Sequence, residues 1–364
     1  MEPLDLGRLK VFPLAARKSL TQVDEILIDP DAEPRPVNDF NRRLIDECAA
    51  RIRAARARGA AVMLIYGAHL LRNGAARLLD RCLERGWLTH LATNGAGTIH
   101  DWEYAWFGQS SESVRMNVAD GTFGAWHETA LHIHLALLAG GVRGEGYGRS
   151  LGRLIAEDGV TLPTVDELEA AVRADPRHPL AGARVELLRA MLAHGLPAGR
   201  MEVVHRWPHG SIVGQAFRRG VPLTVHPGIG YDIISNHPIF NGAAIGRGAE
   251  LDFKTFGGSV DRLDGGVVLS VGGAVMGPQV LEKSLSCVNN LRLQDGRPTL
   301  AGHSIFVVDL QDGGRWDWSQ GEPPRDNPAY YLRFCKSFAR MGGSMRYLQC
   351  DNAAFIHNLY HALR

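Results

Sequence analysis

The segment HLATNGAGTIHDWE (residues 90–103) contains the features that decide the fold of this chain. The apolar run over residues 87–92 predicts a buried strand, and the small residues 93–98 predict a turn that leads into a helix near His100. A strand, a turn of small residues and a helix together let backbone N–H groups approach a phosphate. The spacing matches neither of the common Gly-rich phosphate-binding fingerprints, so an ordinary tight turn is the alternative interpretation.

The residues before this segment repeat the same alternation of helix and strand. Residues 38–59 read as a helix that Asn38 or Asp39 caps and Gly59 ends. Residues 60–69 then read as a buried strand and residues 70–86 as the next helix. Strands that alternate with helices of this length indicate βαβ units and a parallel sheet, and continuous apolar runs indicate strands covered on both faces.

The rest of the chain extends this α/β pattern around a mainly helical segment at about residues 124–200. Thr164 and Glu167 within that segment have the spacing of a capping box. We therefore predict an α/β fold with a parallel sheet, helices on both faces and a helical insertion. Residues 1–37 are predicted to be an irregular N-terminal extension, and residues 38–364 a single domain. Further strands are expected in three segments: 221–232, 265–275 and 304–310.

Composition excludes several classes of function. The 364 residues carry a net charge of +1, with 40 Lys and Arg against 39 Asp and Glu, which predicts neither a nucleic-acid nor a membrane partner. The five cysteines include no CxxC pair, which argues against a disulfide framework or a zinc ribbon and favours a reducing compartment. No apolar run has the length of a signal peptide core or a membrane span, so we expect a cytoplasmic protein.

Small residues also follow other predicted strands, at Gly67-Ala68-His69, at residues 225–232 and at residues 270–278. Ligands of open parallel sheets bind beyond the carboxyl ends of the strands. We therefore expect a ligand crevice at this edge of the sheet, with His69, His100, Asp232 and Asp351 nearby. Tightly packed loops are the alternative interpretation.

The sequence contains two other kinds of candidate site, a pair of histidines that could bind a metal and a lysine that could act as a nucleophile. His132 and His134 lie two residues apart on a helical pattern, so they point to different faces, and we predict no metal site. Lysine is scarce in this chain, and Lys336 follows an aromatic, apolar stretch. A lysine in such a pocket can act as a nucleophile, but the residues alone favour the alternative, a surface lysine with a partly buried stem.

Several of these segments resemble deoxyhypusine synthase, and more closely its bacterial homologues, from about residue 38 to the C-terminus. The family's Thr-Thr-Ala-Gly-Gly-Val-Glu-Glu-Asp motif falls on residues 93–101, and its Gly-Gly-Gly turn falls on residues 272–274. Its Pro-to-Lys segment, which ends in the lysine that forms an imine, has the same spacing from Pro328 to Lys336. Its Ser-Asn-Leu-Ile-Ser-Ser-Gly segment and its final Asp-Ala strand end fall on residues 68–74 and 350–353.

This resemblance implies a Rossmann-like fold that binds NAD, and a homotetramer with sites shared between subunits. It also implies hydride transfer from an amine to NAD and an imine held by Lys336. The implied cofactor-binding residues are Ala68, Thr93, Asn94, Gly95, Ala96, Gly97, Gly272, Gly273, Asp309, Asp351 and Asn352.

The positions that hold the polyamine in the family differ in this chain. The family's histidine falls near Pro278, its tryptophan becomes Phe334, and its nearby glutamate becomes Tyr330. Its paired glutamates become Ile99 and His100. The resemblance therefore predicts a retained cofactor site beside a changed substrate site.

The sequence thus predicts an NAD-dependent enzyme acting on an amine or amino-acid-like substrate. The predicted catalytic residues are Lys336, His100, His69 and Asp232. Aminoalkyl transfer, deamination and cyclisation are the reactions that remain open. The alternative is a non-catalytic, NAD-binding or regulatory protein of the same fold.

Overall fold

The computed structural model describes residues 2–364, whose internal contacts group them into two compact units. Unit 1 contains the residues up to Glu25, Thr98–Arg218 and Pro227–Asp252. Unit 2 contains Ile26–Gly97, Arg219–His226 and Phe253–Arg364. The two units do not meet at residue 37, where the sequence predicted a boundary. Instead, the chain passes repeatedly from one unit to the other. The single domain over residues 38–364 stays a prediction.

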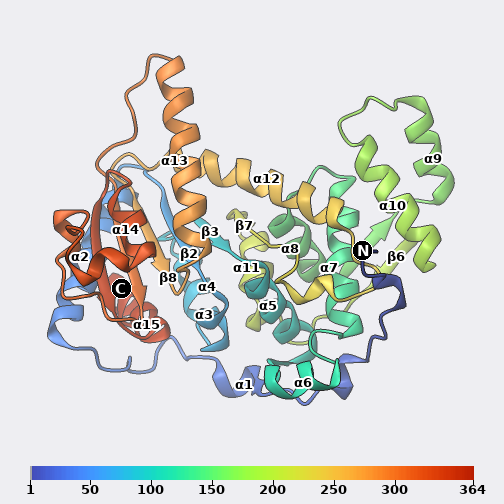
Figure 1. Ribbon diagram of the computed structural model, residues 1–364, viewed down its shortest axis with the longest axis horizontal. Coiled ribbons are helices and arrows are strands. Elements are labelled where there is room, and N and C mark those ends of the chain that lie inside the picture. The colour runs from blue at the N-terminus through green and yellow to red at the C-terminus, as the bar shows by residue number, and fades with distance from the viewer. Residues whose placement is uncertain (1) are drawn as a thin grey trace. The chain divides into compact units, whose positions relative to one another are not determined.

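A six-stranded parallel sheet forms the centre of unit 2 (Figure 1). Its order is β10-β9-β8-β2-β3-β7, so the first of these strands in the chain, β2, lies beside the fourth, β8. This is the order of the doubly wound dinucleotide-binding fold, and β2 and β8 flank its topological switch point. The strands are β2 Val62–Tyr66, β3 His90–Thr93, β7 Leu223–Val225, β8 Val267–Val271, β9 Ser304–Asp309 and β10 Ser344–Gln349.

Helices cover both faces of this sheet, as the sequence predicted. Residues of α12, α13 and α14 form one apolar core with Met63, Ile65 and Val268 on one face. Helices α2 and α15 contact each other and strands of the same sheet, and α15 also contacts α3 and α4. The helices of unit 2 are α2 Asp39–Ala57, α3 Ala68–Arg72, α4 Ala76–Glu84, α13 Met276–Gln294, α14 Arg333–Ala339 and α15 Asn352–Leu363, with 3-10 turns η5 Trp318–Gln320 and η6 Pro328–Tyr331.

Local signals account for most of these boundaries. All five residues of β2 are buried, as expected for a strand covered on both faces. The side chain of Asn38 caps α2 by accepting a hydrogen bond from the Asn41 N–H, which confirms the predicted cap. The single helix predicted over residues 70–86 is wrong, since the chain turns between α3 and α4. Gly74 has φ +85° there, and a Cβ on it would lie 1.8 Å from the Ile26 carbonyl oxygen.

Unit 1 is mainly helical. The predicted capping box of Thr164 and Glu167 is present at the start of α9. Two small antiparallel pairs, β1–β4 and β5–β6, accompany the helices, and α5 and α12 each run from one unit into the other. The elements are η1 Leu6–Arg8, η2 Leu14–Ala16, β1 Thr21–Gln22, α1 Val23–Ile26, α5 Gly95–Phe107, β4 Gln109–Ser110, α6 Val114–Asp120, α7 His127–Gly141, α8 Tyr147–Ala156, β5 Gly159–Leu162, α9 Val165–Ala174, α10 Ala181–His194, β6 Gly199–Glu202, η3 Pro208–Gly210, α11 Ile212–Arg218, η4 Ile233–Ser235 and α12 Gly242–Val260.

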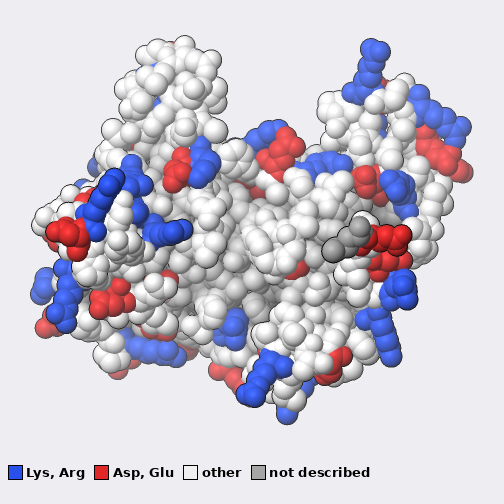
Figure 2. All heavy atoms as spheres, in the orientation of Figure 1, with Lys and Arg blue, Asp and Glu red and all other residues white. Residues whose placement is uncertain are grey.

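The molecular surface carries both signs of charge. On the face shown in Figure 2, basic and acidic side chains are interspersed, and neither sign forms a broad patch. Within residues 2–364, none of the helices combines the length and the apolar character that a membrane span needs.

Candidate functional site

The carboxyl edge of the unit 2 sheet contains a close backbone contact at its switch point. A Cβ on Gly67 would lie only 2.1 Å from the carbonyl oxygen of Gly272, so no larger residue fits there without movement. Gly272 has φ +62°, a conformation that favours glycine. Because α3 lies with the helices of one face and α13 packs against the other, the chain diverges from this contact in opposite directions. In open parallel sheets, ligands bind where the chain diverges in this way.

Asn352 extends this backbone contact to the end of β10. It is 7% exposed, and its Nδ2 atom would lie 2.4 Å from a Cβ placed on Gly272. Among the described residues, nothing forms a hydrogen bond with its Oδ1 atom. A buried amide oxygen without a partner at a strand end is the feature that a bound polar ligand would complete. The predicted residues Gly272, Gly273 and Asn352 therefore lie together.

In the turn after β3, two predicted cofactor-binding side chains form hydrogen bonds with the protein's own backbone. Thr93 Oγ1 donates a hydrogen bond to the Tyr66 carbonyl oxygen, 3.0 Å away. Asn94 Oδ1 accepts from the Gly97 N–H at 2.9 Å and so caps the start of α5. A Cβ on Gly97 would lie 2.1 Å from Thr93 Oγ1, which explains the glycine. Gly95 and Ala96, the other predicted residues here, form the first turn of α5.

Two predicted carboxylates also lie at this edge and already have local partners. Asp309 ends β9, and its Oδ1 accepts from the Gln311 N–H at 3.1 Å. Asp351 caps α15 by accepting from the Ala354 N–H at 2.8 Å, and lies 3.8 Å from Arg35. Ionised carboxylates have several acceptor positions, so these bonds do not exhaust either group.

His69 follows β2 and begins α3 beside Ala68. Partial burial and the nearby Arg72 guanidinium lower its pKa, and the Asp309 carboxylate opposes that shift. Its Nε2 atom lies 3.5 Å from an Arg72 nitrogen. The ring is therefore mainly neutral at neutral pH, which is the form that can accept a proton.

Lys336 lies in the last turn of α14, the short helix that connects β9 to β10. Its Nζ atom lies 3.6 Å from the centroid of the Tyr330 ring. The aromatic neighbour that the sequence indicated is present, and this geometry is a cation–π contact.

The remaining two predicted residues, His100 and Asp232, belong to unit 1. His100 lies on α5, and its Nδ1 atom is 2.7 Å from Ser110 Oγ. Asp232 is 4% exposed, and its Oδ2 accepts from the Gly228 N–H at 2.8 Å. The other predicted residues thus all belong to unit 2, and these two belong to unit 1.

A cavity of about 910 Å³ opens beside the end of β10, and the sequence did not indicate it. Its walls include the aromatic side chains of Phe40, Trp316 and Trp318, the carboxylates of Asp312 and Asp317, and the guanidinium groups of Arg315 and Arg346. These residues come from the start of α2 and the loop after β9, which are far apart in the chain. Asp351 also lines it, so it adjoins the strand-end residues described above. Within residues 2–364, His, Cys, Asp and Glu form no cluster suited to a metal ion.

Comparison with known proteins gives a distant likeness in fold. The sequence matches no protein-family model and no curated protein. Unliganded AgrE is 14% identical, with a TM-score of 0.44 over 90% of this chain and 34% of AgrE. ArgZ, a cyanobacterial arginine dihydrolase, is 12% identical, with a TM-score of 0.40 over 91% of this chain and 33% of ArgZ. A putative LOR/SDH protein of Methanococcus maripaludis S2 is 13% identical, with a TM-score of 0.41 over 92% of this chain and 73% of that one.

These likenesses are too distant to carry an argument about activity. AgrE has also been solved with ornithine and NAD+, which is a property of that protein. This chain spans about a third of the length of AgrE and of ArgZ. The function therefore has to be argued from the chain's own residues.

Proposed function

We propose that this chain is an NAD-dependent enzyme that oxidises an amine or an amino-acid-like substrate, related to deoxyhypusine synthase. The observation that carries the proposal is the contact of Gly67 with Gly272 at the switch point of a doubly wound sheet. In this fold, dinucleotides bind across the crevice at that point, with glycines where the backbone must approach the pyrophosphate.

Several groups at this edge suit a dinucleotide. The turns after β2, β3 and β8, at Gly67–Ala68, residues 93–97 and Gly272–Gly273, would face its phosphates, and the unpartnered Asn352 oxygen would accept a hydrogen bond. Asp309 and Asp351 would serve its ribose hydroxyls. NAD+ bound there supplies an acceptor for a hydride.

The cavity beside β10 suits the amine. The aromatic rings and carboxylates of this cavity attract an alkylammonium group through cation–π contacts and charge, and Arg315 and Arg346 attract the carboxylate of an amino acid. Asp312 and Asp317 would therefore replace the carboxylates that are missing at the positions matched to the family. This feature favours an amine or an amino-acid side chain over a neutral substrate.

In this proposal a histidine is the base that removes a proton from the substrate. An ammonium has no lone pair, so it must lose a proton before a hydride can leave the adjacent carbon. The neutral ring of His69 can take that proton, and His100 and Asp232 are the other candidates. Lys336, once its amine has left the Tyr330 ring and lost a proton, would add to the carbon of the resulting imine, and the substrate nitrogen would leave as an amine, so that a lysine imine remains.

The contact between Lys336 and Tyr330 also favours the second candidate, a non-catalytic NAD-binding or regulatory protein of this fold. A lysine held as an ammonium over an aromatic ring is a stable structural arrangement and has no need of reactivity. The homotetramer with shared sites and the cytoplasmic location stay predictions from the resemblance and the composition.

A turnover assay separates the two candidates. The protein would be mixed with NAD+ and a panel of amines and basic amino acids, and NADH followed by its absorbance. We expect NADH, or substrate loss without net NADH if the hydride returns. Borohydride trapping followed by peptide mass spectrometry should then label Lys336, and Lys336→Arg should lose the label. NAD+ binding without conversion of any amine would contradict the enzyme and support the regulatory protein.

A further inference from the structure

Five charged side chains line the cavity beside β10, and they differ in whether the protein itself neutralises them. They are Asp312, Arg315, Asp317, Arg346 and Asp351, all of unit 2. A charged group has a limited number of donor or acceptor positions, so an internal partner leaves fewer of them for a ligand. The groups without such a partner are therefore the ones that decide which ligand fits.

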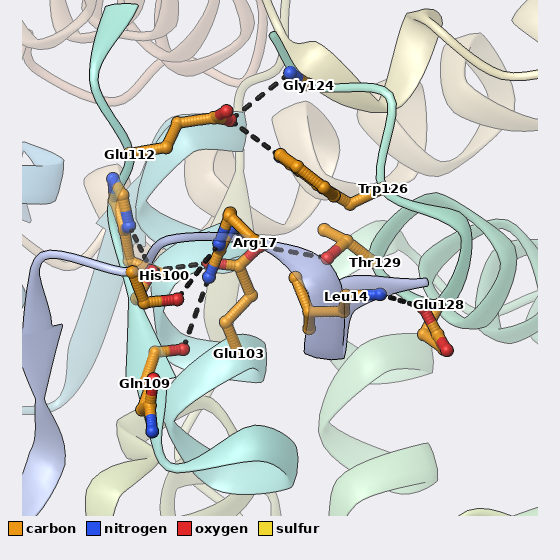
Figure 3. Close-up of polar contacts among 12 residues, drawn as sticks. Leu14, Arg17, His100, Glu103, Gln109, Glu112, Gly124, Trp126, Glu128 and Thr129 are labelled. Carbon is orange, nitrogen blue, oxygen red and sulfur yellow. Dashed lines mark hydrogen bonds and ion pairs between the residues drawn. The ribbon is translucent and has the colours of Figure 1, made fainter. Parts of the chain in front are cut away.

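Arg346 has an internal partner, as a structural arginine of unit 1 does. In unit 1, Arg17 Nη1 and Glu103 Oε1 lie 2.7 Å apart, each side chain is 1% exposed, and Figure 3 shows the two pointing toward each other. In unit 2, Arg346 Nε donates to Glu47 Oε2 at 3.1 Å, and its Nη2 atom lies 3.1 Å from Glu47 Oε1. Such a two-bond pair fixes both groups, so Glu47 offsets much of the charge that Arg346 brings to the cavity.

Two of the three carboxylates are engaged as well. Both oxygens of Asp317 accept hydrogen bonds, from the Ser319 N–H at 3.0 Å and from Gln320 Nε2 at 3.3 Å. Asp351 caps α15 and lies 3.8 Å from Arg35. These two acids thus have partners that hold or balance them.

Asp312 and Arg315 have no such balance. Within the described part of the chain, neither forms an ion pair, although they lie three positions apart in the loop after β9. The Arg315 guanidinium has no hydrogen-bond partner among the described residues, and Asp312 uses only Oδ1, which accepts from the Gly314 N–H at 2.9 Å. The cavity therefore contains one cation and one anion that are both unpaired.

The backbone holds Arg315 in a conformation that arginine rarely adopts. Its φ is +53°, directly after Gly314 at +72°. Left-handed backbone is unfavourable for a residue with a Cβ, and such residues are frequent at ligand-binding sites. A Cβ on Gly314 would lie 2.7 Å from Ala329 Cβ, and Trp318 Nε1 donates to the Gly313 carbonyl oxygen at 3.0 Å. The packed loop thus fixes where its arginine begins.

We infer that Arg315 and Asp312 are the specificity-determining pair of this cavity, and that its substrate is an amino acid with a free carboxylate, not a polyamine. The inference rests on the proposed function for the cavity as the substrate site. The guanidinium of Arg315 would donate to the substrate carboxylate, which its planar fork matches. Asp312 would accept from the ammonium, and Phe40 and Trp316 would cover the methylene groups between them.

A polyamine would satisfy only half of this arrangement. All of its charged groups are cations, so Asp312 would attract them and Arg315 would repel them. An amino acid carries both signs and offsets both side chains. The unpaired arginine therefore acts against polyamines as well as in favour of amino acids, which is how binding sites gain specificity.

The test compares ligands that differ by one carboxylate, L-lysine with cadaverine and L-ornithine with putrescine. Binding to the full-length protein, with and without NAD+, is followed through the ¹⁵N-tryptophan indole signals, because Trp316 and Trp318 line the cavity. Trp316→Phe assigns one of these signals. We expect the wild type to bind each amino acid about fivefold more tightly than its diamine, as for a partly exposed ion pair.

Three variants show which group is responsible. Arg315→Asn removes the guanidinium and keeps a residue that tolerates left-handed backbone, so the loop should stay folded. It should weaken the amino acids about fivefold and leave the diamines unchanged or tighter. Asp312→Asn should weaken both kinds of ligand, since both carry an ammonium. Arg325→Asn is the matched control, because Arg325 is exposed and outside this cavity, and it should change neither.

Three results would overturn the inference. They are diamines that bind the wild type as tightly as the amino acids, a preference for amino acids that survives Arg315→Asn in a folded protein, and no binding of any of the four ligands. The readout is binding, so it is separate from turnover. If amino acids are preferred through Arg315 and no amine is oxidised, the specificity pair stands and the proposed function fails. If diamines are preferred and oxidised, the proposed function stands and the inference fails.

Discussion

The glycine contact of unit 2 and the buried ion pair of unit 1 are built in opposite ways. The first depends on backbone shape, since Gly67 and Gly272 approach closely because they lack side chains. The second depends on charge, since Arg17 and Glu103 are buried only because each neutralises the other. Adding a methyl group should therefore destabilise the glycine contact, and removing one charged partner should destabilise the buried ion pair.

The largest effect is expected in the buried ion pair. Glu103→Gln leaves the Arg17 guanidinium buried without a counter-charge, and we expect a loss of about 3–5 kcal/mol in the free energy of unfolding. Urea denaturation would measure it. Glu169→Gln is the control, because Glu169 pairs with Arg173 on the surface, where such a pair contributes less than about 1 kcal/mol. Equal losses in the two variants would refute the distinction.

The backbone-built contact should show a smaller loss of stability. Gly67→Ala forces its Cβ against the Gly272 carbonyl oxygen, and overpacking of this kind costs about 1–3 kcal/mol. Gly257→Ala is the matched control within α12, because a Cβ there meets nothing within 4 Å. Alanine should be neutral or stabilising at that helical position. Thermal unfolding of both variants checks this, and an unchanged Gly67→Ala would show that the contact is loose.

Acid should weaken unit 2 through a buried histidine. Burial lowers the pKa of His90 to about 3, while Ser259 and Thr224 hold its ring nitrogens at 2.8 and 2.9 Å. The pKa of His90 in the folded protein is below the ordinary value of 6.5. Its contribution to the free energy of unfolding is therefore fully present above pH 6.5 and is lost as the pH falls toward 3. Between about pH 7.5 and pH 5.5 this amounts to about 1.4 kcal/mol.

The pH dependence is checked by urea unfolding of His90→Gln and of His194→Gln at both pH values. His194 is exposed, so its replacement should leave the pH dependence of unfolding unchanged. His90→Gln should flatten that dependence by the amount given above. The same slope in both variants would show that His90 does not control the acid response.

The smallest effect concerns the lysine contact. Tyr330→Leu removes the ring beneath Lys336 and should cost about 0.5–1 kcal/mol. Tyr331→Leu is the control, since Tyr331 is 76% exposed beside it. Tyr330→Leu should also speed the modification of Lys336 by an amine reagent, because the ring no longer packs against its Nζ atom. Unchanged stability and unchanged modification would remove the cation–π interpretation.

The sequence predicted the features that depend on local patterns and missed those that depend on contacts between distant segments. The alternation of apolar strands with helices, the Asn38 cap and the Thr164 capping box are local patterns, and each is present as predicted. Strand-end glycines predict a ligand edge because parallel strands share one carboxyl end, and that edge stays a prediction. The break at Gly74 was missed because its cause is a contact with Ile26, a residue from another segment.

Sequence patterns could not indicate the buried Arg17–Glu103 pair or the β10 cavity. Arg17 and Glu103 have no fixed spacing, and an arginine or a glutamate in a helical pattern ordinarily indicates a solvent-exposed face. Phe40 and Trp316 approach each other only through tertiary packing around β10. Only burial and contacts between distant segments, which require coordinates, distinguish such residues from the rest of the surface.

Calorimetric titration with NAD+ tests the central claim, that the Gly67–Gly272 contact forms a dinucleotide site. The account predicts that the wild type and Gly257→Ala bind one NAD+ per chain with equal affinity. Gly67→Ala should bind at least about tenfold more weakly, a loss of about 1.4 kcal/mol or more. NAD+ binding that Gly67→Ala leaves unchanged in a folded protein, or no binding by the wild type, would contradict it.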